Sequence, residues 1–122
     1  MENTSGITVS DVTGTHNGTA AGSLDPTTDS LSGITGRALQ FSSASGDRVQ
    51  IPNTGGLTNM SSLSISAWIK PESFYNCYSG IYYGMIYVTD GLSSPDGYGF
   101  GFGPNQRLSF FVNSGPKRDS AN

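Results

Sequence analysis

Short runs of alternating apolar and polar residues, bounded by glycine, proline or other turn residues, constrain this chain more than any other feature. An alternation with a period of two places one set of side chains on each face of a β-strand. The clearest run is Ser62–Lys70, in which Leu63, Ile65, Ala67 and Ile69 alternate with Ser64, Ser66, Trp68 and Lys70. Pro71 follows and cannot donate to a strand ladder. The pattern therefore predicts a β-strand with one apolar face over Ser62–Lys70.

Two further alternating runs lie near the C-terminus and predict a β-hairpin. Tyr98–Gly103 places its aromatic residues on one face and its glycines on the other, which leaves that second face bare. Arg107–Asn113 alternates in the same way, and Pro104-Asn105-Gln106 separates the two runs. A three-residue connection between alternating runs is typical of a hairpin.

The rest of the chain carries weaker signals. Four more strands are predicted, at Ile7–Val12, Arg37–Ser42, Arg48–Pro52 and about Gly84–Thr89. Gly, Ser, Thr and Asp dominate Thr13–Gly36, which predicts a loop with a turn at Asp25-Pro26. Ser43–Asp47 is predicted as a turn, Phe74–Gly97 as an irregular excursion around the Gly84–Thr89 strand, and Ser114–Asn122 as a frayed tail.

Composition agrees with an all-β chain and excludes several alternatives. Only 12% of the 122 residues are charged, 17 are glycine, and the formal net charge is −3. Helical bundles need more Ala, Leu, Glu and Lys than this chain has, and six scattered Lys and Arg residues form no basic stripe for nucleic acid. No apolar run approaches the length of a membrane-spanning helix, so no membrane insertion is expected.

The predicted core is small. Its members are the apolar residues that share a face of each predicted strand: Leu39, Phe41, Val49, Ile51, Leu63, Ile65, Ala67, Ile69, Met85, Tyr87, Phe100, Phe102, Leu108, Phe110 and Val112. Burying a large apolar side chain contributes roughly 1.5–3 kcal/mol, whereas ordering each residue costs about 1.5 kcal/mol. Such a core does not favour a comfortably stable monomer, and a lone antiparallel sheet would expose two edges. We therefore expect a partner to cover some of this surface.

Cysteine usage and the N-terminus bear on the cellular compartment. Cys77 is the single cysteine, so the chain has no internal disulfide. The N-terminal ten residues have neither a basic n-region nor an apolar h-region. Three explanations stay open: a signal was removed and Met1 added, the protein is cytosolic, or it leaves the cell by another route, as a virion component would.

Three motifs in order resemble one known family. They are Gly36-Arg37-Ala38-Leu39-Gln40-Phe41, then Gly46-Asp47-Arg48-Val49-Gln50-Ile51-Pro52, then Leu63-Ser64-Ile65-Ser66-Ala67-Trp68-Ile69-Lys70-Pro71. Together with Asp11 and the Gly14–Gly18 stretch, they resemble the laminin-G-like domains of the concanavalin A-like lectin/glucanase superfamily. The similarity covers about Asp11 to Asn113.

The resemblance implies a fold and an organisation. It implies an antiparallel β-sandwich of the jelly-roll, concanavalin A-like type, formed by a single domain over residues 1–122 with residues 1–10 and 114–122 at its periphery. The family's second half, with its His-containing strand, has no counterpart here. The chain is then a fragment, a shortened fold, or a sandwich that a partner completes.

Catalysis is not expected. Glucanases need two carboxyl groups flanking a glycosidic bond, but Glu2 and Glu72 are the only glutamates and lie far apart in sequence. Asp90 and Asp96 bracket a Gly/Ser/Pro loop with no strand between them. His16 lies in a Gly/Thr loop without a nucleophile elbow, and Cys77 lacks a plausible base.

A calcium site is implied by the resemblance, at one rim of the sandwich. Calcium takes six or more oxygen ligands from flexible loops. The residues expected to hold it are Asp11, Asn17 and Asp47, with Asp25 and Asp29 as further oxygen donors. The alternative for all five is a turn or capping role, in which the side chain accepts a hydrogen bond from its own loop.

Aromatic residues are the candidates for ligand binding. Trp68 alternates against Leu63 and Ile65, so it faces solvent, where it could stack on a sugar ring, or a second layer, where it would pack. Tyrosines crowd the excursion that follows, and four of them join Trp68 as expected ligand-binding residues: Tyr75, Tyr78, Tyr82 and Tyr83. Their alternative role is a packing cluster or an intersubunit contact.

These observations lead to two functional expectations. The first is a non-catalytic carbohydrate- or glycoprotein-binding module that acts outside the cell, with calcium as its cofactor. The second is a structural or assembly subunit, such as a virion surface, fibre or filament component, that self-associates or is completed by another chain through exposed strand edges and the tyrosines. A glycoside hydrolase fragment is a distant third.

Overall fold

The protein is described by a computed structural model covering residues 4–5, 7–52, 56–57, 61–72, 83–88, 98–102, 107–112 and 118–119. Two compact units make it up, Met1–Gly55 and Gly56–Asn122. Within the described ranges the regular structure is strand apart from one 3-10 turn, and every strand pair is antiparallel. The predicted all-β class is confirmed. No helix in these ranges is long and apolar enough to cross a bilayer.

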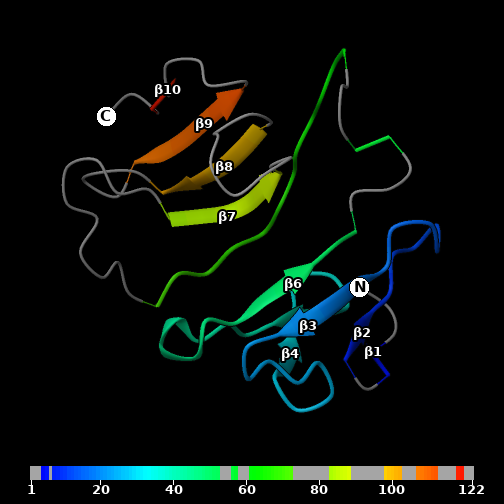
Figure 1. Ribbon diagram of the computed structural model, residues 1–122. Helices are drawn as coiled ribbons and strands as arrows, with labels where there is room; N and C mark the ends of the chain where they lie inside the picture. The colour runs from blue at the N-terminus through cyan, green and yellow to red at the C-terminus, as the bar shows by residue number, and fades with distance from the viewer. Residues whose placement is uncertain are drawn as a thin grey trace. The chain divides into compact units, whose positions relative to one another are not determined.

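The first unit is organised around a four-stranded sheet of order β1-β2-β3-β6 (Figure 1). Its strands are β1 (Thr4–Ser5), β2 (Thr8–Val9), β3 (Gly18–Ala21) and β6 (Arg48–Gln50). The register sets Val9 opposite Gly18 and Ala20 opposite Val49. β2 lies within the predicted Ile7–Val12 strand, and β6 ends two residues before the predicted Pro52.

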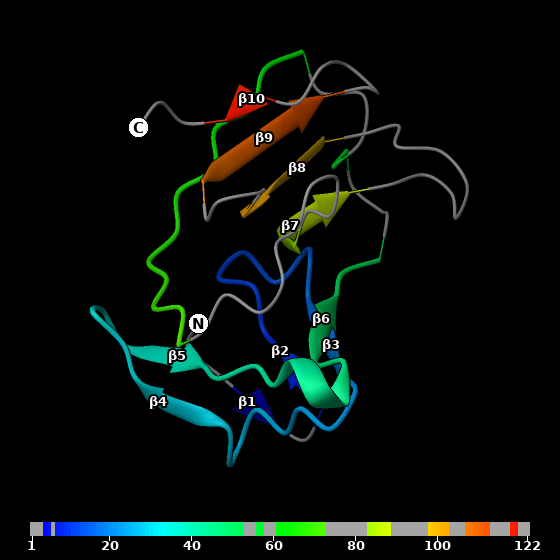
Figure 2. The same cartoon turned by 90° about the vertical axis from the view of Figure 1, so that its left-hand side faces the viewer.

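A second element of this unit is the hairpin of β4 (Ser30–Ser32) and β5 (Arg37–Leu39), seen clearly in Figure 2. Gly33 N–H donates to the Gly36 carbonyl (2.9 Å) and closes the connection. The Arg37 guanidinium donates to the Ser30 hydroxyl (Nε, 2.9 Å) and to the Ser30 carbonyl (Nη2, 3.1 Å). These side-chain bonds fix two short strands that would otherwise be marginal.

Most of the core of the first unit lies where the sequence predicts a loop. Among its described residues the buried hydrophobic ones are Val9, Ala20 and Leu24, at 7%, 7% and 4% exposure, and Pro26 is fully buried. Only Val9 of these lies in a predicted strand. β3 and β4 also lie inside Thr13–Gly36, so the prediction of a loop there is wrong. Small residues such as Gly18 and Ala20 give no hydrophobic periodicity, although they allow neighbouring strands to approach closely.

The predicted core residues are mostly at the surface. Six of them are exposed, namely Phe41, Ile51, Ala67, Ile69, Leu108 and Phe110, so their assignment to the core is wrong. Another six are half-buried, namely Leu39, Val49, Leu63, Ile65, Phe100 and Phe102. The side chains of Met85, Tyr87 and Val112 lie outside the described ones. The alternation therefore predicts which residues share one face of a strand, but it does not predict whether other residues cover that face.

The second unit is a four-stranded antiparallel sheet of order β10-β9-β8-β7. Its strands are β7 (Tyr83–Val88), β8 (Tyr98–Phe102), β9 (Leu108–Val112) and β10 (Arg118–Asp119). β8 and β9 confirm the predicted hairpin, with Phe100 opposite Phe110, and β7 confirms the predicted strand to within a residue at each end. β10 shows that the predicted frayed tail contributes a short strand, while the Pro104-Asn105-Gln106 turn lies outside the described residues.

The glycine face of β8 is buried rather than bare. Gly99 and Gly101 are both buried, and the register sets Gly101 opposite Ser109, which is 4% exposed. The aromatic face of β8 is only half-buried at Tyr98, Phe100 and Phe102. The apolar face of β8 is therefore the more accessible one.

Residues 61–72 form no strand, so the prediction for Ser62–Lys70 is wrong as a statement of regular structure. Leu63 and Ile65 are half-buried and Ser64 and Ser66 exposed, so the alternation of faces is present at its start. No strand of the described residues pairs with the segment, which Figure 1 draws as a green trace without an arrow. A two-faced pattern needs a neighbouring strand edge before it becomes a ladder.

The backbone at Gly22 generates a prediction about stability. Gly22 has φ +83°, and a Cβ there would lie 2.8 Å from both Asp47 Oδ1 and the Ser45 carbonyl, whereas Gly14, at φ +73°, has nothing within 4 Å. Gly14→Ala should therefore carry only the left-handed backbone cost of about 1–2 kcal/mol. Gly22→Ala should lower the free energy of unfolding further, by roughly 1–3 kcal/mol of overpacking. Urea denaturation of both variants measures this difference; equal losses would contradict the close approach.

Candidate functional site

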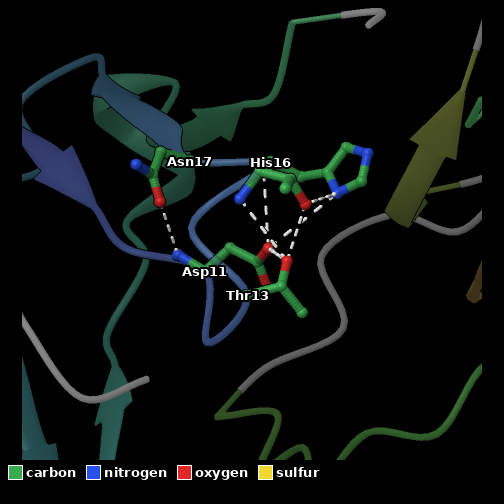
Figure 3. A network of polar contacts seen from close by, with 5 residues as sticks. Asp11, Thr13, His16 and Asn17 are labelled. Carbon is green, nitrogen blue, oxygen red and sulfur yellow. Dashed lines mark hydrogen bonds and ion pairs between the residues drawn. The ribbon is translucent and has the colours of Figure 1, made fainter. Parts of the chain in front are cut away.

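The Asp11 turn, residues 11–17, holds the densest polar network among the described residues (Figure 3). Asp11 and Asn17 close it, because the Asp11 N–H donates to Asn17 Oδ1 (2.9 Å). The Gly14 N–H donates to the Asp11 carbonyl (3.0 Å), and the positive φ of Gly14 permits that tight turn. Asp, Asn and Gly are the residues that such turns favour, so local sequence explains the geometry.

The Asp11 carboxylate lies at the centre of this turn. Its Oδ2 accepts from the Thr13 hydroxyl and from the His16 N–H (3.3 Å). The Thr13 hydroxyl, ahead of the backbone N–H donors of the turn, holds the pKa of Asp11 below its ordinary value. Hydrogen bonds to the charged form have this effect even at an exposed carboxyl. The turn thus keeps an anionic oxygen cluster at the surface, formed by Asp11, Thr13 and Thr15.

A hydroxyl, an imidazole and a carboxylate meet here, yet their arrangement differs from a catalytic triad. The Thr15 hydroxyl lies 2.9 Å from His16 Nδ1, and Asp11 Oδ2 lies 3.8 Å from the same nitrogen. A triad places the nucleophile and the carboxylate on opposite ring nitrogens, so that the imidazole passes the proton between them. The contacts of His16 described above therefore hold the turn in its conformation and do not form a proton relay.

Asp47 occupies a different loop and ties two chain segments together. Its Oδ1 accepts from the Ser23 N–H (2.8 Å) and its Oδ2 accepts from the Ser42 N–H (2.9 Å). The Asp47 N–H in turn donates to the Ser42 carbonyl (3.2 Å), around the 3-10 turn Ser43–Ser45. The predicted Ser43–Asp47 turn is confirmed, and both carboxylate oxygens already have backbone partners.

Asp25 and Asp29 close a third turn, the one predicted at Asp25-Pro26. Asp25 Oδ1 accepts from the Thr27 N–H (2.9 Å) and the Thr27 hydroxyl (2.6 Å), and the Asp25 N–H donates to Asp29 Oδ2 (2.8 Å). The Thr27 hydroxyl is the main cause of a lowered pKa of Asp25. The Asp29 N–H donates to the Asp25 carbonyl (2.7 Å), which confirms the turn.

The structure brings together only part of the predicted calcium set. Asp11 and Asn17 share the Asp11 turn, while Asp47 binds the Ser23 and Ser42 amides in its own loop. Searching the described ranges finds no group of three or more His, Cys, Asp or Glu residues placed to hold a metal ion. Calcium binding through backbone and amide oxygens stays a prediction.

Of the predicted ligand-binding residues, Trp68 is the one whose side chain is described. It is 81% exposed, within the extended segment 61–72. Tyr83 begins β7, where only its backbone is described, and Tyr75, Tyr78 and Tyr82 lie outside the described residues, as do Cys77, Asp90 and Asp96. The alternative packing role of Trp68 does not fit an indole this exposed.

The sequence analysis missed the hydroxyl and amide partners of the carboxylates. Thr13 and Thr27 each follow an aspartate by two residues, and each donates its hydroxyl to that aspartate. This Asp-x-Thr spacing is a local signal that could have been found. The Ser23 and Ser42 amides that bind Asp47 are distant in sequence from each other and carry no such signal.

The two Asp-x-Thr turns generate a reciprocal prediction. Thr13→Val should raise the pKa of Asp11 toward its ordinary value and leave that of Asp25 unchanged, and Thr27→Val should do the opposite. Carboxyl-carbon NMR titration measures both groups in each variant. Because the folded pKa is depressed, each bond stabilises the fold above the unfolded pKa and is lost as the pH falls through the folded pKa. Both threonine variants should therefore lose less stability on acidification; unchanged pKa values would contradict the assigned bonds.

Comparisons with protein-family models, with curated proteins and with solved structures find no match for this chain. The resemblance to laminin-G-like domains therefore stays a prediction. Function has to be argued from the exposed surfaces and the turns described above.

Proposed function

We propose that this protein is a non-catalytic structural or assembly subunit whose all-β units associate with further chains. The observation that carries the proposal is the inverted distribution of apolar side chains. Ten large hydrophobic side chains of the described residues are exposed, among them Val12, Ile34 and Trp68, whereas the buried hydrophobic residues in the same ranges are Val9, Ala20 and Leu24. Leu108 and Phe110 lie opposite Phe102 and Phe100 in the β8–β9 register, so part of this apolar surface is contiguous. Contiguous exposed apolar patches mark interaction sites, whereas single exposed apolar residues are ordinary.

The non-catalytic part of the proposal is supported by how the carboxylates are used. Asp11, Asp25 and Asp47 each accept hydrogen bonds from neighbouring amides or hydroxyls and close a turn. A general acid or nucleophile needs a carboxyl oriented toward a substrate. Structural use of these groups favours a scaffold role, outside the cell or on a virion surface.

The jelly-roll sandwich belongs to this proposal as well. Two small four-stranded antiparallel sheets are present, and each leaves apolar side chains at least partly exposed. A sandwich needs a second layer about 10 Å from each such face. We propose that association with another chain supplies that layer.

Concentration-dependent association is the direct test of the assembly proposal. Light scattering after size exclusion, over about a hundredfold range of protein concentration, should show mass rising with concentration. Since the exposed residues named above are uncharged, the association should persist at high salt. A strict monomer at every concentration would refute the assembly function.

A second function, carbohydrate binding, is favoured by one specific observation, the 81% exposure of Trp68. The apolar C–H face of a sugar ring packs well on an exposed indole, and Trp68 is the only tryptophan, so its fluorescence reports such contact directly.

The expected result is sub-millimolar binding to a glycan found by array screening, with a change in Trp68 emission. Trp68→Ala should abolish binding, and Ile34→Ala, at another exposed apolar residue, should leave it unchanged. Removal of calcium with a chelator should weaken glycan binding, because the ion is expected to hold the binding loops. Binding that survives Trp68→Ala, or no glycan bound at millimolar sugar, would remove this candidate.

A further inference from the structure

The two edges of the second unit's sheet differ in how they are protected. β10 and β7 are the outer strands in the order β10-β9-β8-β7, as both Figure 1 and Figure 2 show. β10 has two residues, Arg118 and Asp119, and both are charged. β7 has six residues, with no charge and no proline. Charges, prolines and short strands are the usual means of blocking edge-to-edge pairing, so β10 is protected, whereas β7 has none of these and pairs with no described strand on its outer side.

One feature of β7 partly protects it. The register with β8 shifts between Gly84 and Ile86, which is a β-bulge. Regular pairing resumes at Ile86 and continues to Val88, opposite Phe100 and Tyr98. A bulge twists a strand locally, but the three residues after it present ordinary backbone groups on the outer side. The open edge is therefore the part of β7 from Ile86 to Val88.

The same unit contains a strand-like segment without a ladder. Residues 62–70 have alternating faces at Leu63–Ser66, are uncharged up to Lys70, and pair with no strand of the described residues. Trp68 and Ile69 are exposed in that state. Such a segment gains backbone hydrogen bonds and apolar burial together when it joins a sheet edge.

We propose that residues 62–70 of one copy of the chain add as an outer strand to the β7 edge of a second copy. This inference rests on the proposed assembly function, for which it names the donor and the acceptor. A second copy is the fitting partner because each chain carries both the donor segment and the acceptor edge, so copies can exchange the segment with one another. Neither Ser62–Ile69 nor β7 carries charge, so like-charge repulsion does not oppose the pairing.

The geometry of exchange determines the product. Reciprocal addition between two copies closes a symmetric dimer, whereas one-way addition from copy to copy extends a fibre. In both products Leu63 and Ile65 lie on one face of the added strand and Ser64 and Ser66 on the other, as their present burial already separates them. Ladder bonds supply affinity, and the alternate side chains supply specificity.

Ser66→Pro and Ala67→Pro, made separately, test the donor. An outer strand donates to its neighbour through the N–H groups of alternate residues, so one of these two prolines removes a ladder donor from the middle of the added strand. Both residues are exposed and outside any described strand. For that variant, the association constant from sedimentation should fall about tenfold or more, the equivalent of roughly one lost ladder bond. Ser66→Thr, which suits a strand, is the matched control and should associate like the parent chain.

The acceptor is tested by Ile86→Lys, with Thr19→Lys as the control at an exposed polar residue of β3, an inner strand of the first unit's sheet. A lysine on the edge should reduce association, and the control should not. Because Ile86→Lys could impair folding, a synthetic peptide of residues 61–72 provides an independent test on the unaltered protein. It should compete with association, and the same peptide with both Ser66→Pro and Ala67→Pro should not.

The possible failures are distinguishable. Association that is insensitive to both proline variants and to the peptide would overturn strand addition and leave the assembly function standing. A strict monomer would overturn both. A monomer in which hydrogen exchange shows strong protection of residues 62–70 would show that the segment pairs within its own chain, and this also overturns the inference.

Discussion

A β-strand is stable only when its edges and its apolar face have partners, and this requirement governs what the chain can do. The described strands meet the requirement only in part. β8 and β9 each have two neighbours, while β7, β6 and the β4–β5 hairpin each have a free edge within the described residues. Apolar side chains such as Phe41, Ile51 and Phe110 remain exposed. In the proposed function, association supplies both kinds of partner at once.

The first unit compensates for a small core with turns built on carboxylates. Asp11, Asp25 and Asp47 lie in three separate turns, and each accepts hydrogen bonds from amides close by in space. Asp47 is the most consequential, because it joins the Ser23 and Ser42 segments and leaves no room for a side chain at Gly22. Loops fixed in this way hold short strands in register.

The alternation of faces made β7, β8 and β9 predictable from sequence, although the segment 62–70 of the same unit forms no strand. The hairpin of β8 and β9 has strong alternation on both strands and a short connection, which are local properties, and β7 followed from its own local pattern. The core of the first unit could not be predicted. β3 pairs with β6, almost 30 residues later, and its small residues Gly18 and Ala20 show no periodicity. Sequence patterns report which residues share a face, but long-range pairing decides which face is covered.

The site shows the same division between local and long-range information. Asp11 and Asn17 were expected to hold a calcium ion together, and the structure places both in one turn, where the Asp11 N–H donates to Asn17 Oδ1. Asp47 was expected beside them but is held by amides of other segments. Two roles were open for Trp68, stacking on a sugar ring or packing against a second layer. Its side chain is exposed because residues 62–70 pair with no described strand, which the neighbouring residues in the sequence do not reveal. Ser62–Lys70 carries the strongest strand pattern in the chain and yet pairs with no strand of the described residues, which is why it is the centre of the proposed assembly.

Unfolding by urea at several protein concentrations tests most directly whether this chain depends on partners for its stability. Association that involves only the folded form stabilises it by mass action, so the midpoint should rise as the concentration is increased about a hundredfold. The free energy of unfolding should also fall more steeply with urea concentration than the surface buried in one chain's own core explains. A midpoint independent of concentration, with the slope of a well-packed single chain of 122 residues, would contradict the account.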